Sequence, residues 1–523
     1  MLLLALMLLS LQQPQLSLGL IPTVCVANVT SKASVCCPVP KGFSQPCGGR
    51  GRGECVRIQA YQEFENYHPG LVKDDRLMWP SRFFEFGCQC DSRYWGADCG
   101  ECFFGWRGPR CNQRDVRLRR NIFTLSPAER DQYREISRLM RVKMSPYSVL
   151  IEKYNNQSDP LRSPVFVPAT VHYWLVYVHR YASRRTLFPD AKQCQQFGIL
   201  DLNHGGPGFM TWHRYYTMML ERELHKIAVE RFNWTTFGLP YWDWVDATWC
   251  EVCQNDIVGA PGECDNFGQR LHPASPFGGW DEFCTTPSAK DRQQLGGGSC
   301  YGCHAAERFG KLVRQWTSLS LPTTAEVNYG LSIPRYYYPE EFNRPAQDLE
   351  NCGFARYLEG HCGPMELYGK IGTLHNKVHN SVMGSFCCAA TAPNDPIFFM
   401  HHSQISRLVH MWFLRHRPHP VDMANINVSP GHDRQSYMVG FYPPIRHEEV
   451  FTDIASLGYE YDTLEFGEPV RRRLQKEGRM PKPTLKHFVN CQRGFLHPQH
   501  RLHRHEFEDE LQRFLAEHPG AAT

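Results

Sequence analysis

Four segments of the chain repeat apolar residues at helical spacing, and each of them contains histidine. The run from Pro168 to Arg180 opens with a proline suited to a first helical turn and continues without a helix breaker, which predicts a buried helix. Apolar positions also step by three or four residues after Trp212 and between Ile371 and Val382. A fourth helix is predicted to start where Asp395 can cap it and Pro396 follows. We therefore expect a mainly α fold, an antiparallel four-helix bundle with histidine in its core.

A different pattern precedes these helices. Ten of the 22 cysteines lie before residue 112, and this even number is consistent with up to five disulfides. The stretch Cys88–Cys111 combines close cysteine spacing with glycine and aromatic residues, which is typical of an EGF-like module. A zinc ribbon is the alternative, but its paired Cys-X-X-Cys knuckles are missing, and secretion favours disulfides.

Two later cysteine pairs have Cys-X-X-Cys spacing, Cys250 with Cys253 and Cys300 with Cys303. Such spacing occurs in redox motifs. Neither pair follows a strand in a βαβ pattern, so we expect structural bridges.

The chain starts with a short apolar run, Met1–Leu11, and small residues follow at Ser17–Gly19. We interpret residues 1–19 as a signal peptide, because the run is too short to anchor the chain in a bilayer. Asn-X-Ser/Thr sequons at Asn28, Asn156 and Asn233, with a fourth at Asn427, agree with a secretory route.

Composition narrows the function classes. The 523 residues are 42% hydrophobic and 21% charged, values of an ordinary globular protein. Lys and Arg number 57 against 53 Asp and Glu, so the net charge is only +4. Nucleic acid is therefore not an expected partner.

The histidines carry the candidate chemistry. Six of them form an upstream and a downstream triplet: His172, His204, His213, His375, His379 and His402. A single histidine on an apolar helix face is usually a hydrogen-bonded core residue, but six together are not explained in that way. Neutral imidazoles without carboxylate or thiolate partners suit copper. We predict a binuclear copper site that handles dioxygen.

Four phrases around these histidines resemble the tyrosinases, within the type 3 copper proteins that include catechol oxidases and hemocyanins. They are His204 and His213 before Arg214, Leu239–Trp244, Leu374–His379, and Asn394–Phe398 leading to His402. The resemblance covers about residues 25–462. Within the family, the layout of the chain is similar to that of the animal pigment-cell group. It implies residues 20–113 as the cysteine-rich region, 114–462 as the copper-binding domain and 463–523 as a tail.

The resemblance also implies residue roles. The two triplets would hold one copper ion each. His179 is the rival of His172, and we favour His172 because His172-Tyr-Trp is similar to the family's His-Tyr-aromatic phrase. Phe398 falls where the family places an aromatic ring over the metal pair, and His401 is expected to have a packing or hydrogen-bonding role.

A water that accepts the phenol proton is a further implication of the resemblance. Asn376 would hold it together with a carboxylate, for which Glu359 and Glu366 are the candidates. Solvated surface is the alternative for either glutamate.

The predicted function is hydroxylation of monophenols and oxidation of o-diphenols to o-quinones with O₂, inside a melanosome-like lumen or after secretion. Alternatives are a zinc protein similar to dopachrome tautomerase, a catechol oxidase without monophenol activity, and an O₂ carrier. Trp244 and His401 favour the copper oxidase over the zinc proteins, whereas Gly205–Pro207 and Trp212–Tyr215 are closer to the tautomerase phrase. A single unit behind a disulfide module favours an enzyme over a carrier.

The tail, residues 463–523, is basic and rich in histidine, and has no apolar stretch near the ~20 residues that a membrane span needs. Its histidines at 497, 500, 503 and 505 could bind metal, but a solvated tail is the favoured interpretation. Cys491 is isolated there and could pair with another chain.

Overall fold

The structure is a computed structural model that describes residues 20–30, 34–58, 76, 79–81, 83–150, 166–184, 201–265, 268–283, 311–317, 320–338, 352–363, 372–387, 392–425, 428–484, 487 and 491. Several predicted features lie outside these residues: the signal peptide, Asn156, Asn427, Cys300, Cys303, Glu366 and the four tail histidines. Within the described residues, no helix combines the length and the apolar character needed to cross a membrane.

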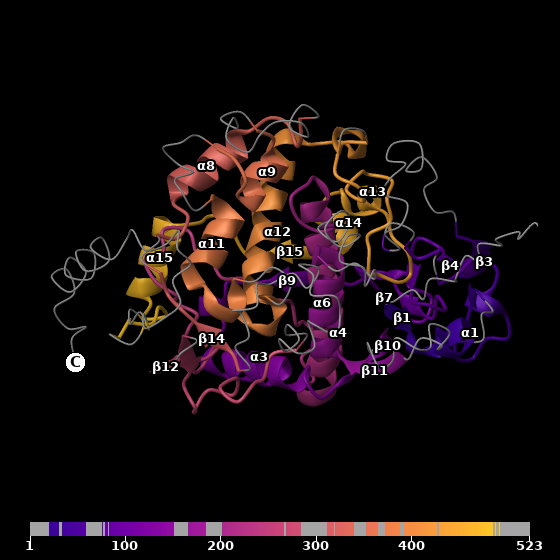
Figure 1. The fold of residues 1–523 in the computed structure, drawn as a ribbon, viewed down its shortest axis with the longest axis horizontal. Helices are drawn as coiled ribbons and strands as arrows, with labels where there is room; N and C mark the ends of the chain where they lie inside the picture. Colours follow the sequence, from indigo (N-terminus) through magenta and orange to yellow (C-terminus); the bar gives the residue numbers. More distant parts are fainter. Residues whose placement is uncertain are drawn as a thin grey trace, which may run out of the picture.

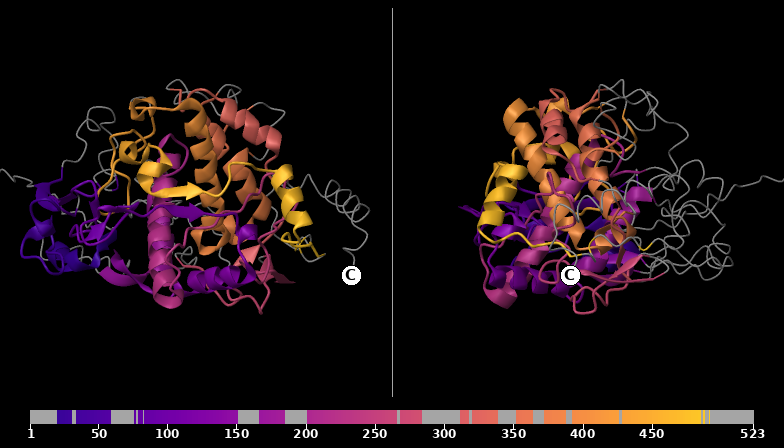
Figure 2. Two further views of the ribbon diagram at one scale, coloured as in Figure 1. Left: turned by 180° about the vertical axis from the view of Figure 1, so that it is seen from behind. Right: turned by 90° about the vertical axis from the view of Figure 1, so that its left-hand side faces the viewer.

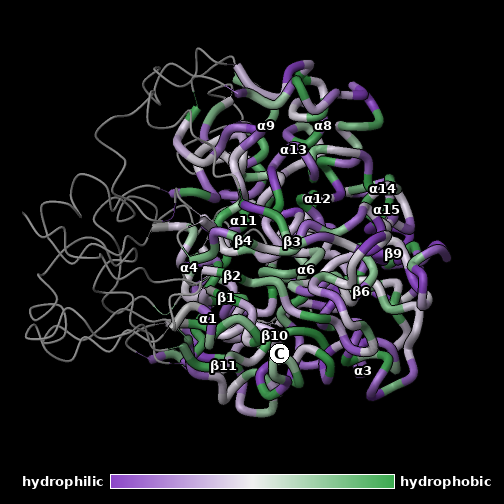
Figure 3. Tube along the Cα trace, turned by 90° about the vertical axis from the view of Figure 1, so that its right-hand side faces the viewer, coloured by the Kyte–Doolittle hydropathy of each residue, from purple (hydrophilic) through white to green (hydrophobic). Residues whose placement is uncertain are grey.

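Four helices occupy the centre of the molecule (Figure 1), one at each predicted place. They are α4 (Val171–Arg184), α6 (Gly208–Phe232), α11 (Leu374–Val382) and α12 (Ile397–His416). Hydrophobic stretches, green in Figure 3, run along α12 and near β10. Both α6 and α12 are buried over most of their lengths, as expected for helices at the core of a large domain.

The predicted start of the first helix was wrong. Pro168 lies in strand β11 (Phe166–Thr170), where it pairs with Ser148 of β10 (Met144–Leu150), and α4 begins only at Val171. The strand order β1-β10-β11 makes β11 an edge strand. An edge tolerates proline because the missing N–H faces away from the ladder, so a proline that suits a first turn suits this strand as well.

Shorter elements surround the centre. The other α-helices in the described residues are α1 (Val26–Thr30), α3 (Pro127–Leu139), α8 (Thr324–Ser332), α9 (Phe354–Glu359), α13 (His447–Val450), α14 (Ile454–Leu457) and α15 (Glu468–Lys476). Small sheets pair β1 (Leu20–Pro22) with β10, β2 (Val35–Cys36) and β3 (Gly53–Arg57) with β4 (Phe86–Cys90), β5 (Tyr94–Trp95) with β6 (Glu101–Cys102), β7 (Trp106–Arg107) with β8 (Gln113–Arg114), β9 (Arg117–Arg119) with β15 (Tyr459–Tyr461), and β13 (Gln269–Leu271) with β12 (Pro261–Cys264) and β14 (Val313–Arg314).

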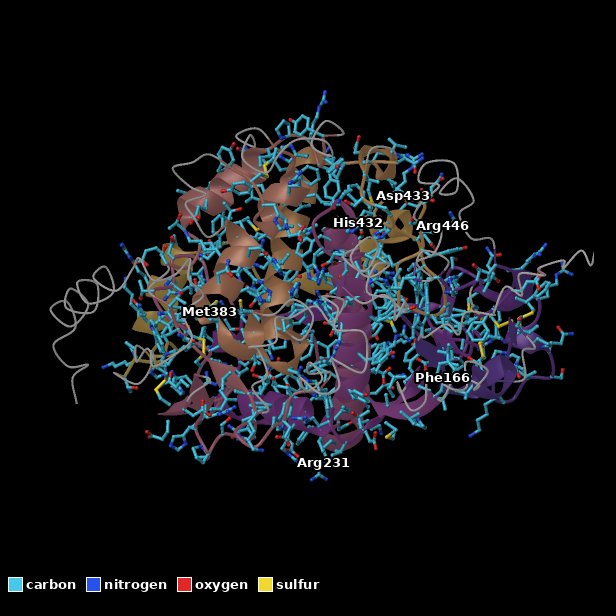
Figure 4. All side chains as sticks on the ribbon, viewed as in Figure 1. Phe166, Arg231, Met383, His432, Asp433 and Arg446 are labelled. Atoms are coloured by element: carbon cyan, nitrogen blue, oxygen red, sulfur yellow. A yellow bond between two sulfur atoms is a disulfide. The ribbon has the colours of Figure 1, made fainter. Side chains whose placement is uncertain are left out.

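The N-terminal region forms one end of the molecule, at the right of Figures 1 and 4. All ten of its cysteines pair with one another: Cys25–Cys36, Cys37–Cys55, Cys47–Cys88, Cys90–Cys99 and Cys102–Cys111. The predicted five disulfides are confirmed. Cys250 and Cys253 also form the expected structural bridge.

The first part of the tail, which contains α15, packs on the opposite end of the molecule (Figures 1 and 2). Arg471 of α15 makes a buried ion pair with Glu251, because a guanidinium can satisfy a buried carboxylate in a fork geometry. Cys491 bonds to Cys264 of the same chain. The expected pairing of Cys491 with another chain is therefore wrong.

Candidate metal centre

Two clusters of histidines, all buried except the half-buried His204, meet between the central helices. In each cluster, one ring nitrogen of every member lies within 4.8 Å of the others. The upstream cluster is His179, His204 and His213, and the downstream cluster is His375, His379, His401 and His402. Five of the six predicted ligands are thus brought together, and His172 is not among them.

His172 has a structural environment of its own. Its Nε2 donates to the Pro393 carbonyl oxygen at 3.1 Å, and its ring packs against Trp280 and Phe283 with centroid distances of 4.9 and 5.4 Å. The prediction that His172 joins His204 and His213 is therefore wrong. Two helical turns separate it from His179, about 10 Å along the axis.

The packing of α4 against α6 explains why His179 is selected. His179 Nε2 lies 3.2 Å from His213 Nε2, and Tyr216 Oη donates to the Leu175 carbonyl oxygen at 3.0 Å. From the first contact to the second, the α4 residue number falls from 179 to 175 while the α6 residue number rises from 213 to 216. The two helices are therefore antiparallel. The last turns of α4 then face the first turns of α6, where His213 lies.

The downstream cluster comes from two helices. His375 and His379 are four residues apart on α11, with ring centroids 4.5 Å apart, because residues at this spacing share one helix face. Their partners His401 and His402 come from the first turns of α12. The clusters face each other closely: the rings of His213 and His402 stack at 4.5 Å with an interplanar angle of 13°.

Backbone and side-chain acceptors fix the orientation of several rings. Nδ1 of His213 donates to the Phe209 carbonyl oxygen at 2.9 Å, and Nδ1 of His379 donates to that of Phe386 at 2.6 Å. His204 Nδ1 donates to Asp201 Oδ1 at 3.1 Å. With Nδ1 protonated, a neutral ring presents its Nε2 lone pair, which is the form that binds a metal ion.

Burial keeps the rings of four clustered histidines neutral. It lowers the pKa of His379 to about 3, and it holds the pKa of His213, His375 and His402 well below the ordinary value. The charged form of a buried imidazole is disfavoured because it loses its hydration. No proton has to leave these rings before they can bind a cation at neutral pH.

Two phenylalanines contact both clusters. Phe398 lies 4.1 Å from the His402 ring and 5.1 Å from the His179 ring. Phe209 lies 4.6 Å from His213 and 4.7 Å from His375. Sequence reasoning singled out Phe398 and missed Phe209. The signal was available, because each phenylalanine precedes a clustered histidine by four residues in its helix.

The comparisons with known proteins agree with this arrangement. Residues 169–415 match the family model described as the common central domain of tyrosinase. A tyrosinase of Gallus gallus is 33% identical over 473 residues, which are 88% of this chain and 84% of that protein. The chain belongs to the tyrosinase family.

Other members are nearly as similar. A tyrosinase of Felis catus is 32% identical and matches 86% of this chain and 83% of that protein. A 5,6-dihydroxyindole-2-carboxylic acid oxidase of Mus musculus is 30% identical and matches 84% of this chain and 82% of that protein. The family therefore includes proteins named for different reactions.

Glu359 and Asn376 both lie beside Nδ1 of His375. Its Nδ1 is 2.9 Å from Asn376 Oδ1 and 3.3 Å from the Glu359 carbonyl oxygen. The Glu359 carboxylate is buried: Oε1 accepts a hydrogen bond from the Gly205 amide at 2.6 Å, and Oε2 has no hydrogen-bond partner in the described part of the chain. The solvated-surface interpretation of Glu359 is therefore wrong.

Asp395 was predicted to cap α12, but the N-cap is Pro396 and Asp395 precedes it by one residue. Its carboxylate accepts a hydrogen bond from the Ile397 amide at 3.0 Å and pairs with Arg314 at 2.8 Å. Since Asp395 is fully buried, this pair fixes the start of α12 relative to β14.

Replacing Asp201 with asparagine is expected to weaken metal binding at the upstream cluster by about 10-fold, because a neutral amide orients His204 less strongly than a carboxylate. Chelator competition on the purified protein measures this affinity. Asp243→Asn is the matched control, since the buried Asp243 carboxylate bonds to Gln404 and Gly467 instead of a clustered histidine. Equal affinities in the two variants would contradict the prediction.

Proposed function

We propose that this protein is a tyrosinase that binds two copper ions, hydroxylates monophenols at the ortho position and oxidises o-diphenols to o-quinones with O₂. The observation that carries the proposal is the close approach of two buried imidazole clusters, with His213 and His402 stacked at 4.5 Å. Two separate structural metal sites would not need such an approach. The family membership supports the same reaction.

The residues present fit a copper pair. All donors are imidazoles, which suit copper, zinc or iron. His375 Nε2 and both ring nitrogens of His402 are buried without a hydrogen-bond partner in the described part of the chain, and a buried polar atom without a partner is costly unless a ligand takes that place. A bound copper pair would supply the electrons and the open positions that dioxygen chemistry needs.

We assign three histidines to each ion. His179, His204 and His213 would hold one, and His375, His379 and His402 the other. Five of these histidines come from the four central helices, which we infer to form an antiparallel bundle, and His204 lies on the loop before α6. The carbonyl and carboxylate partners of Nδ1 orient these rings. Phe209 and Phe398 exclude water from between the clusters.

Glu359 and Asn376 are proposed to hold the water that takes the phenol proton. Oε2 of Glu359 is a buried acceptor without a partner in the described part of the chain, and Asn376 Oδ1 lies 2.9 Å from Nδ1 of His375. Glu359 and Asn376 therefore both lie next to His375, where a water could accept hydrogen bonds or donate to them.

Asn376→Asp is expected to lower tyrosine hydroxylation by about 10-fold and catechol oxidation by less, because the new charge perturbs His375 and only the monophenol depends strongly on assisted deprotonation. Paired assays with tyrosine and catechol measure the ratio. Asn380→Asp on the same helix is the control, since Asn380 follows His379 as Asn376 follows His375. A larger loss on catechol would refute the proposed role.

Metal exchange tests the function as a whole. The chelated, metal-free protein should regain O₂ consumption with tyrosine and catechol after two equivalents of copper, and none after zinc. A protein that carries two zinc ions as isolated and isomerises dopachrome without O₂ would instead belong with the tautomerase alternative. Activity on catechol alone would indicate a catechol oxidase, and reversible O₂ binding without turnover a carrier.

We also infer that the enzyme works in the secretory pathway, as a secreted or lumenal protein whose residues 20–113 form an EGF-like module before the copper domain. Eight disulfides in the described residues support an oxidising compartment. The sequon residue Asn233 is exposed at the end of α6. A mobility shift after glycosidase treatment that is smaller in Asn233→Gln than in the parent would test glycosylation there.

A further inference from the structure

His401 differs from His213 and His379 in the direction of its hydrogen bond. Its Nδ1 lies 3.1 Å from Trp244 Nε1, and both side chains are fully buried. An indole N–H can only donate, so Nδ1 of His401 must be the acceptor and cannot carry a proton. An imidazolium ring is thereby excluded, and the single proton of the neutral ring sits on Nε2.

The N–H and the lone pair of His401 are therefore reversed relative to those of His213 and His379. His213 and His379 direct their N–H groups outward to backbone carbonyls and keep a lone pair for the centre. His401 directs its lone pair outward to Trp244 and keeps an N–H. That Nε2 is buried and has no acceptor in the described part of the chain.

The ring of His401 lies against the other members of the downstream cluster. Its ring stacks on His375 at 5.1 Å and lies 4.9 Å from His379 and 5.6 Å from Phe386. A protonated nitrogen cannot coordinate a cation. His401 thus lies within the cluster, but its protonated Nε2 cannot serve as a metal ligand.

We propose that Trp244 and His401 form a positioning pair that supplies a fixed N–H donor to an oxygen atom in the metal centre. This inference rests on the proposed function. The acceptor has the chemistry of an oxygen lone pair, and either the phenolic substrate or dioxygen can provide it. Trp244 acts through His401, because its hydrogen bond determines which ring nitrogen carries the proton.

Trp244→Phe is the first test, because it removes the indole N–H and keeps an aromatic ring. In metal-free protein labelled with ¹⁵N-histidine, NMR of the ring nitrogens should show His401 protonated on Nε2 alone in the parent and mixed tautomers in Trp244→Phe. The His401 signals are assigned by their loss in His401→Gln. An unchanged tautomer in Trp244→Phe would overturn the proposal.

Binding measurements distinguish the two oxygen sources. With copper restored, Trp244→Phe should bind two ions per chain like the parent, and should show either a Kd for benzoate or a KM for O₂ raised by about 10-fold, the usual effect of losing one buried hydrogen bond. A weaker benzoate complex identifies the substrate oxygen as the acceptor, and a raised KM for O₂ identifies dioxygen. No change in either constant would overturn the proposal.

The matched control is Trp242→Phe. Trp242 is equally buried and donates its indole N–H to Glu251 Oε2 at 3.4 Å, away from the histidine clusters. It should show the same loss of packing as Trp244→Phe without any change in tautomer or ligand affinity. Equal changes in both variants would mean that packing alone explains the effect, which contradicts the proposed pair.

Substitution of His401 itself separates a donor from a ligand. His401→Leu should retain two copper ions per chain and lose affinity as Trp244→Phe does, and His401→Gln should recover part of it through its amide N–H. Loss of one copper ion in His401→Leu would make His401 a ligand and overturn the proposal. If the protein proves to be a zinc tautomerase, the proposed function fails, but the tautomer measurement on metal-free protein still decides whether Trp244 controls His401.

Discussion

Replacing His179 with alanine is expected to remove one metal ion per chain and to reduce catechol oxidation to background. His179 Nε2 lies 3.2 Å from His213 Nε2 in the upstream cluster, so its loss leaves an imidazole pair that holds a metal ion poorly. Both ions are needed for dioxygen chemistry in the proposed mechanism. Metal analysis and oxygen consumption of the purified variant measure the two effects.

His172→Ala is the matched control on the same helix. It should retain both ions and near-normal turnover, because His172 contacts Pro393, Trp280 and Phe283 and lies outside the cluster. Its cost should appear as a free energy of unfolding lower by about 1–3 kcal/mol, since the Pro393 carbonyl loses its donor. Loss of a metal ion in His172→Ala with retention in His179→Ala would reverse the assignment.

Glu221→Gln is expected to lower the free energy of unfolding by about 3–5 kcal/mol, as breaking a buried ion pair does. Glu221 of α6 accepts two hydrogen bonds from Arg119, at 2.8 and 3.1 Å, and neither side chain is exposed beyond 4%. The substitution keeps the shape but leaves the Arg119 charge uncompensated. Glu468→Gln, in the exposed pair with Arg472, should cost under about 1 kcal/mol.

The effect of Glu221→Gln should depend on pH. Burial alone would raise the pKa of Glu221, but the charge and hydrogen bonds of Arg119 outweigh burial and lower it. A folded-state pKa below the unfolded value of about 4.3 means that the stabilisation is complete above pH 5 and is lost as the pH falls through the folded pKa. Urea unfolding at pH 7 and pH 4 should show the gap between parent and variant shrinking in acid. A constant gap would be inconsistent with this origin.

The helix positions and the clustering of five of the six histidines predicted as ligands could be inferred from the sequence because they depend on local patterns. An i, i+4 pair such as His375 and His379 needs only helical geometry to converge. Buried helices can also be recognised from long apolar runs, such as the run that starts at Val171 in α4.

The choice between His172 and His179 could not be made by periodicity. The two residues are seven positions apart on one face, so both satisfy the same helical pattern. What separates them is the register of α4 against α6, a tertiary property. The antiparallel direction would have been a usable signal: the histidine near the end of the first helix faces the histidine near the start of the second.

The polarity of His401 and the partner of Cys491 were beyond sequence reasoning for related reasons. Trp244 and His401 are 157 residues apart, and Cys264 and Cys491 are 227 apart. No local pattern links residues at such separations, and cysteine connectivity in particular cannot be deduced from sequence alone.

The Cys264–Cys491 bond has a consequence for how a nicked chain behaves. A protease that cuts the backbone anywhere between residues 265 and 490 produces two polypeptides that remain covalently joined. A cut before residue 375 would leave His213 on one polypeptide and His379 on the other, yet both clusters would still travel as one molecule. On a denaturing gel such a form runs as a single band until a thiol is added, and only then separates into two.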